Sequence, residues 1–152
     1  MNKQQLLKNL DKAWQHLEES YNGLTESQMA QSGVTAEWSV KDILAHITTW
    51  EEEALKNLPM IIEDRRPPRY KDLYGGLDAF NALMTEKKRG FSLSDIMKQM
   101  ESTHRQFIAY INSAPEEMFT RETRFRHRLR LDTYSHYPIH VKAIQEWRER
   151  SK

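Results

Sequence analysis

Apolar side chains recur every three or four residues in four long stretches of the chain, which is the period of helices with one buried face. The first predicted helix covers residues 3–22, and its apolar stripe consists of Leu6, Leu10, Ala13, Trp14, Leu17 and Tyr21. The second is predicted from Ser39 to about Leu58, because Pro59 lacks the backbone donor that a continuing helix needs. Ser39 is the expected N-cap, and Asp42 stands three residues later as the partner of a capping box.

The second half of the chain is predicted to contain one short helix and two long ones. The short helix covers about residues 78–88 and has Asp78 as its cap. The long helices cover about residues 92–113 and 133–149. Pro138 must lie in the first turn of the last helix, because proline is tolerated only there, so the regular helix should start near residues 134–137. Four long amphipathic helices and little else predict an all-α fold, a four-helix bundle with one short extra helix and long loops.

Two stretches are predicted to be irregular. Residues 64–76 contain Pro67 and Pro68, which stiffen the chain toward an extended form and indicate a long loop. Residues 123–131 alternate between apolar side chains and arginine or threonine, which indicates a short extended segment before the last helix. The basic stretch from Arg121 to Arg130 has two interpretations. It is either a solvated connector or amphipathic edge segment, or a site for an anionic partner.

Length and composition narrow the choice of function. The 152 residues fit a single domain, residues 1–152. The 23 basic and 22 acidic residues nearly balance, so we expect no nucleic-acid partner. The absence of cysteine excludes disulfides, thiol catalysis and thiolate metal ligands, so any metal must have nitrogen and oxygen ligands. With no signal-peptide core and no apolar stretch of membrane-spanning length, we expect a cytoplasmic protein without a membrane partner.

Three histidines are the main candidates for chemistry. His136 and His140 are spaced i, i+4, which places both imidazoles on one face of a helix. His46 lies at the edge of the apolar face of the second predicted helix. Together they could form a facial three-nitrogen site that leaves metal positions open, as a catalytic site requires. Neutral imidazole nitrogens bind zinc, nickel, copper or ferrous iron.

Several side chains near these histidines could complete a site. Asp42, Glu51 and Glu53 are candidates to accept the second N–H of a ligating imidazole. Trp50 and Tyr137 could line a pocket beside the histidines, although large aromatic residues on apolar stripes more often belong to the core.

A histidine on a core-facing stripe can also be a hydrogen-bonded packing residue with no ligand, and this interpretation competes with the metal site. His104 lies on the apolar stripe of the third long helix and is predicted to be such a residue. His16 and His127 are predicted to be surface or connector residues.

The segment from Gly33 to Glu53, which contains Trp-Ser-Val-Lys-Asp-Ile-Leu-Ala-His, resembles the signature of the DinB/YfiT-like superfamily of four-helix-bundle metalloenzymes. More closely, the chain resembles the ClbS/DfsB-type branch of that superfamily. The further matching stretches are Arg65–Tyr70, Asp78–Asn81, Ser92–Ile96, and Thr133–Tyr137 with His140. The resemblance extends over almost the whole chain.

This resemblance implies an up-down-down-up bundle, often a homodimer, with zinc, nickel or another divalent metal held by three histidines. Carried over by motif, the ligands are His46, His136 and His140. Superfamily activities are mostly thiol-dependent transfer and hydrolase-like reactions, and the ClbS-type branch includes proteins that protect against a genotoxic metabolite by hydrolysis. We therefore expect a metal-dependent hydrolase or transferase that acts on a small-molecule substrate.

In this interpretation Glu53 and Tyr137 are the predicted catalytic side chains, and Trp50 and Asp42 are predicted to line the pocket. The alternative is a metal-free protein that binds or sequesters a small molecule in the same pocket. A third interpretation makes the histidines core residues of an interaction module.

Overall fold

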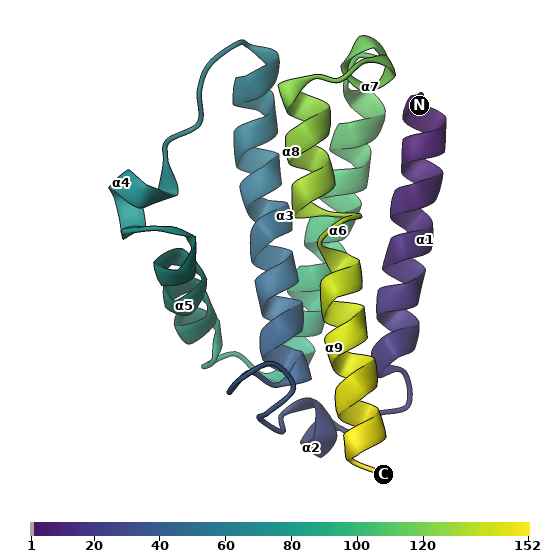
Figure 1. The fold of residues 1–152 in the computed structure, drawn as a ribbon, viewed down its shortest axis with the longest axis vertical. Coiled ribbons are helices and arrows are strands. Elements are labelled where there is room, and N and C mark those ends of the chain that lie inside the picture. Colours follow the sequence, from purple (N-terminus) through teal and green to yellow (C-terminus); the bar gives the residue numbers. More distant parts are fainter. Residues whose placement is uncertain (1) are drawn as a thin grey trace.

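The computed structural model describes residues 2–152 and contains the predicted bundle. The elements of the bundle are α1 (Lys3–Tyr21), α3 (Val40–Ile62), α6 (Leu93–Ser113), α8 (Arg124–Asp132) and α9 (Tyr137–Arg150). In Figure 1, α8 and α9 follow one another along a single line and together make the fourth helix of the bundle. That line and α1 run in one direction, whereas α3 and α6 run in the other, which is the up-down-down-up order. No strand is present in residues 2–152.

The capping box predicted at the start of α3 is confirmed. The Ser39 hydroxyl accepts a hydrogen bond from the backbone N–H of Asp42 at 3.0 Å. In return, the Asp42 carboxylate accepts from the backbone N–H of Ser39, also at 3.0 Å. Ser92 caps α6 in the same sense by accepting from the N–H of Asp95 at 3.1 Å. These caps satisfy backbone donors that the first turn of a helix leaves unpaired, and so they fix where the two helices begin.

Two predicted helix boundaries are wrong. Pro59 does not end α3, which continues to Ile62 with the proline inside its last turn. The proline removes one backbone hydrogen bond, but the extra turn packs Ile61 and Ile62 against buried side chains of the core. Asp78 does not cap the short helix α5 (Leu77–Lys88), because the N-cap position is Gly76 and Asp78 lies in the first turn.

The stretch predicted to be extended, residues 123–131, is helix α8 instead. Thr123 is its N-cap and accepts a hydrogen bond from the N–H of Arg126 at 3.0 Å. Phe125 and Leu129 are fully buried and lie four residues apart, so the stretch satisfies a helical period as well as an alternating one. The last helix begins at Tyr137, at the end of the range 134–137 predicted for its start, and Pro138 lies in its first turn as predicted.

Between α3 and α6 the chain leaves the bundle and forms α4 (Tyr70–Tyr74) and α5. Helix α4 lies in the region predicted to be a loop. Figure 1 shows α4 and α5 beside α3, on the side of the molecule opposite to α1. Phe80 of α5 is fully buried, and its ring centroid lies 5.3 Å from that of Trp50 on α3 and 4.8 Å from that of Tyr70. These aromatic contacts hold the excursion against the bundle and create a space between it and α8.

The remaining elements are the short helices α2 (Glu26–Met29) and α7 (Glu117–Thr120). No helix in residues 2–152 combines the length and the apolarity that a membrane crossing requires.

Candidate metal centre

The three predicted histidines converge in the structure. His46 comes from α3, His136 is the residue before α9, and His140 lies one turn into α9. We call these residues the histidine cluster. The Nε2 atom of His136 lies 3.1 Å from that of His46 and 2.9 Å from that of His140. One nitrogen from each ring can be chosen so that all three lie within 4.8 Å of one another.

The break between α8 and α9 allows this convergence. The backbone N–H groups of His136 and Tyr137 both donate to the carbonyl of Thr133 at 2.8 Å, which closes a tight turn before α9 begins. His136 therefore keeps the position of a residue one turn before His140, although it precedes the helix. On the other side, the cap at Ser39 starts α3 so that His46 is buried, with 7% of its surface exposed.

Burial keeps the histidine cluster uncharged. It lowers the pKa of His46 to about 2, that of His136 to about 4 and that of His140 to about 3. For His46 the neighbouring imidazoles and the Lys88 ammonium lower the pKa further. At neutral pH all three rings are therefore neutral imidazoles, which is the form that donates a lone pair to a metal.

The donor set fits a divalent cation better than it fits hydrogen bonds among the rings. A ring nitrogen of a neutral imidazole carries either one proton or one lone pair, so His136 can form a full hydrogen bond with only one of its two neighbours. A cation can accept a lone pair from each ring. Zinc–nitrogen bonds of about 2.0–2.1 Å also allow two nitrogens about 3 Å apart to share one ion.

The carboxylates predicted to accept the second N–H of these imidazoles do not do so. The Nδ1 atoms of His136 and His140 are buried and have no hydrogen-bond partner in residues 2–152. Asp42 is occupied by the capping box, and Glu51 and Glu53 accept hydrogen bonds from Tyr137 and Tyr70. The orientation of the rings therefore depends on packing rather than on carboxylate partners.

A pocket of about 420 Å³ opens beside the histidine cluster, and we call it the histidine pocket. Its lining comes from α3, from the α4–α5 excursion and from α8 with the turn that follows it. The lining includes His46, Trp50, Tyr70, Asn81, Arg128 and Asp132. The indole N–H of Trp50 donates to the side-chain oxygen of Asn81 at 2.9 Å, which fixes the wall between α3 and α5. The volume lies within the range of small-molecule sites.

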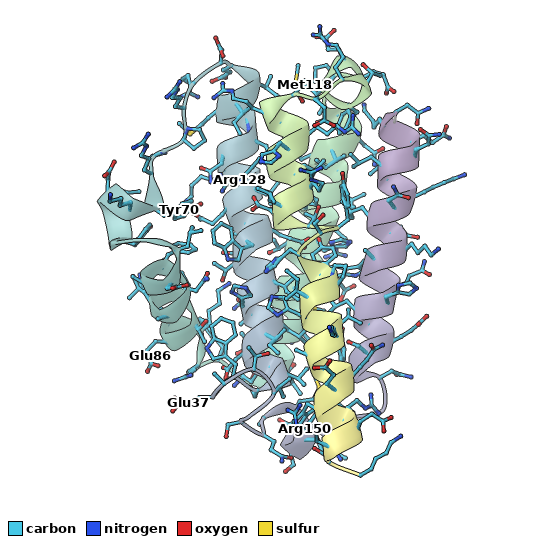
Figure 2. All side chains as sticks on the ribbon, viewed as in Figure 1. Glu37, Tyr70, Glu86, Met118, Arg128 and Arg150 are labelled. Atoms are coloured by element: carbon cyan, nitrogen blue, oxygen red, sulfur yellow. The ribbon has the colours of Figure 1, made fainter. Side chains whose placement is uncertain are left out.

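Arg128 is held at the mouth of this pocket by partners from two elements. Its Nε donates to the Asp132 carboxylate at 2.7 Å, and one terminal nitrogen donates to the Tyr70 hydroxyl at 3.1 Å. Figure 2 shows Tyr70 on α4 and Arg128 on α8 on the same side of the molecule. The guanidinium also lies 5.9 Å from the ring of Trp50 and 5.8 Å from that of Tyr70. These contacts fix a cationic donor beside the histidines.

Burial also affects two of these partners. It raises the pKa of Asp132 to about 6, although the Arg128 guanidinium opposes the change. It raises the pKa of Tyr70 to about 12, with a further contribution from the hydrogen bond that the phenol donates to Glu53 at 2.8 Å. Tyr70 is therefore a protonated phenol at neutral pH, held by Glu53 on one side and Arg128 on the other.

Of three other residues predicted for the site, only one lines the histidine pocket. Trp50 lines the histidine pocket, as predicted for it. Glu53 is buried behind Tyr70 and does not line the pocket, and its second oxygen lies 3.2 Å from the Lys56 ammonium. Asp42 lies in the capping box, with the Arg89 guanidinium at 3.8 Å, and does not line this pocket either.

Tyr137 lies in the core rather than in the pocket. Its side chain is fully buried, and its hydroxyl donates to the Glu51 carboxylate at 2.8 Å. Burial, with Glu51 adding to it, raises the pKa of Tyr137 well above the ordinary value, so the phenol stays protonated. The structure therefore does not bring Tyr137 together with the pocket, and its proposed catalytic role has no geometric support.

Sequence reasoning missed Tyr70, Asn81, Arg128 and Asp132 as pocket residues. One signal was present, because Arg128 and Asp132 have opposite charges at the i, i+4 spacing of a helical pair. It was not used because Arg128 lies in residues 123–131, which were predicted to be extended. Tyr70 and Asn81 have no spacing signal of this kind, although both lie in stretches that match the ClbS/DfsB-type branch, and the path of the excursion brings them to the pocket.

Solved structures of very low sequence identity share this fold over nearly their whole length. That of the sibling lethal factor precursor DfsB has a TM-score of 0.84 at 15% identity and covers 100% of this chain and 98% of that chain. A protein from Streptococcus pneumoniae has a TM-score of 0.80 at 14% identity and covers 98% and 91%. The colibactin self-resistance protein ClbS, in complex with a dsDNA, has a TM-score of 0.77 at 13% identity and covers 95% and 94%.

The ClbS complex overturns one expectation from composition. The near balance of basic and acidic residues predicted that the chain has no nucleic-acid partner, and this exclusion is wrong because a protein of the same fold is found bound to dsDNA. Net charge is a poor guide here since it averages over the whole surface. Contacts to phosphate require only a local group of cations.

A comparison with curated protein sequences finds no match. The model of the DinB superfamily, however, matches residues 9–140, a range that includes the histidine cluster and most of the bundle. The expected fold and the predicted superfamily are therefore both confirmed, and the chain belongs to the DinB superfamily.

Proposed function

We propose that the protein is a metal-dependent hydrolase or transferase that acts on a small molecule in the histidine pocket. The observation that carries this proposal is the convergence of three neutral imidazole nitrogens, 2.9 and 3.1 Å apart in two pairs, at the wall of a pocket. Histidines that serve only as packing residues have no reason to direct their nitrogens at one another in this way. A three-histidine donor set also leaves positions for a substrate.

His46, His136 and His140 would hold the cation. When bound there, a divalent cation would supply Lewis-acid activation of a substrate or of a water or thiol nucleophile. The surrounding side chains have separate tasks. Trp50 provides an apolar wall, and Arg128 can donate hydrogen bonds to a carbonyl or anionic oxygen of the substrate.

Glu53 contributes indirectly in this proposal. It accepts the hydrogen bond of the Tyr70 hydroxyl and thereby leaves the lone pairs of that oxygen directed at Arg128 and Asn57. Glu53 is thus a positioning residue for Tyr70 and Arg128 rather than an acid or base in contact with substrate.

A role in detoxification or self-protection is supported by the fold neighbours. ClbS is described as a colibactin self-resistance protein, and DfsB as a sibling lethal factor precursor. One name refers to self-resistance and the other to a lethal factor, so both associate this fold with a harmful agent or with resistance to one. A small pocket with an activated nucleophile suits the destruction of such a molecule.

Metal uptake tests the proposal. The untagged protein, treated with a chelator and then titrated with Zn²⁺ or Ni²⁺ in a calorimeter, should bind about one ion per chain at micromolar or lower concentration. His46→Ala should weaken binding by more than about 10-fold, because it removes one of three ligands and the loss of a partner outside the ligands already costs about 10–100-fold. His16→Ala is the matched control, since His16 is exposed on α1 and lies far from the site in sequence. Wild-type protein that binds neither ion, or His46→Ala protein that binds as wild type does, would refute the proposal.

The alternative is a metal-free protein that binds a small molecule with the same pocket. The two contacts of His136 Nε2, at 2.9 and 3.1 Å, give this alternative some support, because one of them can be a hydrogen bond between imidazoles without a cation. The two functions differ in their response to chelators. Ligand binding that is unchanged by chelation and unchanged by added Zn²⁺ would support the metal-free function.

A further inference from the structure

A second hollow continues from the histidine pocket along the surface of the molecule. Its volume is about 760 Å³, and it lies between the α4 region and α8. Both hollows are lined by Tyr70, Leu77 and Arg128, so one passes into the other at these three side chains. We call the second hollow the outer groove. A molecule whose reactive end lies at the histidine cluster therefore has a defined direction in which to extend.

Cationic side chains dominate the lining of the outer groove. Arg69 and Lys71 come from the start of α4, and Arg124 and Arg128 come from α8, whereas Glu122 is the one carboxylate in the lining described. The whole chain has a formal net charge of only +1, so this is a local excess and not a general property of the surface. A groove lined by one sign of charge attracts ligands of the opposite sign.

Two of these cations are not neutralised by neighbours. Arg128 is paired with Asp132 at 2.7 Å, and Arg124 lies 3.1 Å from an almost fully exposed Asp64 carboxylate. In residues 2–152, by contrast, neither Arg69 nor Lys71 has a carboxylate within ion-pair distance. Glu122 does not fill this role, because it lies 3.4 Å from Arg126. Arg69 and Lys71 therefore keep their full charge for a ligand.

The same groove offers apolar contact beside the charges. Ile61, Pro67, Pro68 and Leu77 contribute to its lining, and Leu77 is 54% exposed. The two prolines restrict the backbone, so this wall loses little conformational freedom when a ligand binds. The complementary ligand has an apolar body and an anionic group, rather than a charged group alone.

We propose that the substrate of the histidine pocket carries a carboxylate, sulfonate or phosphate group, attached through an apolar segment, which Arg69 and Lys71 bind in the outer groove. This inference rests on the proposed function, because it places the reacting bond at the histidine cluster. A small molecule is favoured over a duplex because the histidine pocket has a volume of about 420 Å³, which is the size of a small-molecule site, and His46 in its wall is only 7% exposed.

The test uses two fluorescent probes that differ only in charge, dansylaminoundecanoic acid and its primary amide, with metal-free protein. The wild type should bind the acid about tenfold more tightly than the amide, as expected for one charge-assisted contact. The double variant Arg69→Gln/Lys71→Gln should lose this preference while binding the amide as the wild type does. Because both side chains are exposed, the variant should fold normally. The control is Lys98→Gln/Arg105→Gln, which removes the same charge from exposed positions of α6 and should keep the preference.

Equal binding of acid and amide by the wild type, or a preference that survives in Arg69→Gln/Lys71→Gln, would overturn the inference. A short duplex oligonucleotide that displaces the acid probe, and does so only when Arg69 and Lys71 are present, would assign the groove to DNA and overturn it as well. Because the probes are measured without metal, a chain that takes up no Zn²⁺ can still show the preference. The failure of the metal proposal and the failure of this inference are therefore separate results.

Discussion

Two polar clusters that contain histidines meet on α3, and they differ in whether their polar groups have hydrogen-bond partners. In the first, the histidine cluster, the Nδ1 atoms of His136 and His140 have no partner in residues 2–152, and the Nε2 atoms crowd together beside a pocket. In the second, the fully buried Glu51 accepts from the Tyr137 hydroxyl at 2.8 Å and lies 2.9 Å from Nδ1 of His104. We call this second cluster the Glu51 network.

The Glu51 network joins all four helices of the bundle. Glu51 lies on α3, His104 on α6 and Tyr137 on α9, and the ring of Trp14 on α1 stacks on His104 with 3.6 Å between centroids and an interplanar angle of 4°. A buried polar network with its groups satisfied stabilises and specifies a core. A buried set of nitrogens that compete for the same hydrogen bonds is instead suited to an added ligand. The difference separates a structural histidine from a candidate ligand more reliably than burial does.

The largest effect expected is the loss of stability in Glu51→Ala. The substitution removes the partner of the buried Tyr137 hydroxyl and of the part-buried His104 Nδ1, and each unsatisfied group costs about 1–3 kcal/mol. The free energy of unfolding, measured with urea, should fall by roughly 2–6 kcal/mol. Glu52→Ala is the control, because Glu52 is half exposed and pairs with Lys88, a contact worth about 0–1 kcal/mol. A loss below about 1 kcal/mol for Glu51→Ala would show that the network does not stabilise the fold.

An intermediate effect distinguishes the two clusters directly. His104→Ala should lose about 2 kcal/mol of stability or more, because it removes a stacked ring and a partner of Glu51. It should nevertheless keep the stabilisation that Zn²⁺ provides, about 2.7 kcal/mol at a free concentration 100 times the dissociation constant. His46→Ala should lose that stabilisation. Thermal unfolding with and without Zn²⁺ measures the loss of stability and the stabilisation by Zn²⁺ in each variant. If Zn²⁺ stabilised the two variants equally, the distinction between a structural histidine and a metal ligand would be wrong.

The sequence predicted the bundle because its long helices bury continuous stripes at a regular spacing. The position of His46 also followed from local rules, since the confirmed capping box at Ser39 and Asp42 fixes the start of α3. His136 and His140 were expected on one helix face, and the turn at Thr133 preserves their spacing although His136 itself precedes the helix. Local periodicity is sufficient to predict where a helix starts and which residues share its face, because residues close in the sequence determine both.

Helix α8 shows where periodicity is ambiguous. Phe125, His127, Leu129 and Leu131 alternate with polar residues, yet the buried pair, Phe125 and Leu129, is also one helical turn apart. Tertiary packing favours the helix, because it buries the side chains of Phe125 and Leu129 together in the core. The arginines between them point to solvent or pair with carboxylates. The error removed Arg128 and Asp132 from the candidate site.

The contact between Tyr70 and Arg128 could not be predicted at all, since it joins residues 58 positions apart through an irregular excursion. Glu53 was selected for its nearness to His46 in the sequence, but Tyr70 stands between it and the pocket. Nearness along a helix does not establish a shared cavity when a neighbouring element can cover the side chain.

The smallest expected effect concerns the role of Tyr137, which was predicted to be catalytic and lies in the Glu51 network. Tyr137→Phe removes one hydrogen bond but leaves Glu51 its contact with His104, so we expect a loss of about 1 kcal/mol of unfolding free energy. Tyr110→Phe is the matched control, because the Tyr110 hydroxyl is buried without a partner in residues 2–152, and its removal should cost nothing. Zn²⁺ affinity should be unchanged in both variants, since neither hydroxyl contacts the histidine cluster. If Tyr137→Phe instead left the stability unchanged and weakened Zn²⁺ binding, Tyr137 would belong functionally to the histidine cluster, and the division between the two clusters would be wrong.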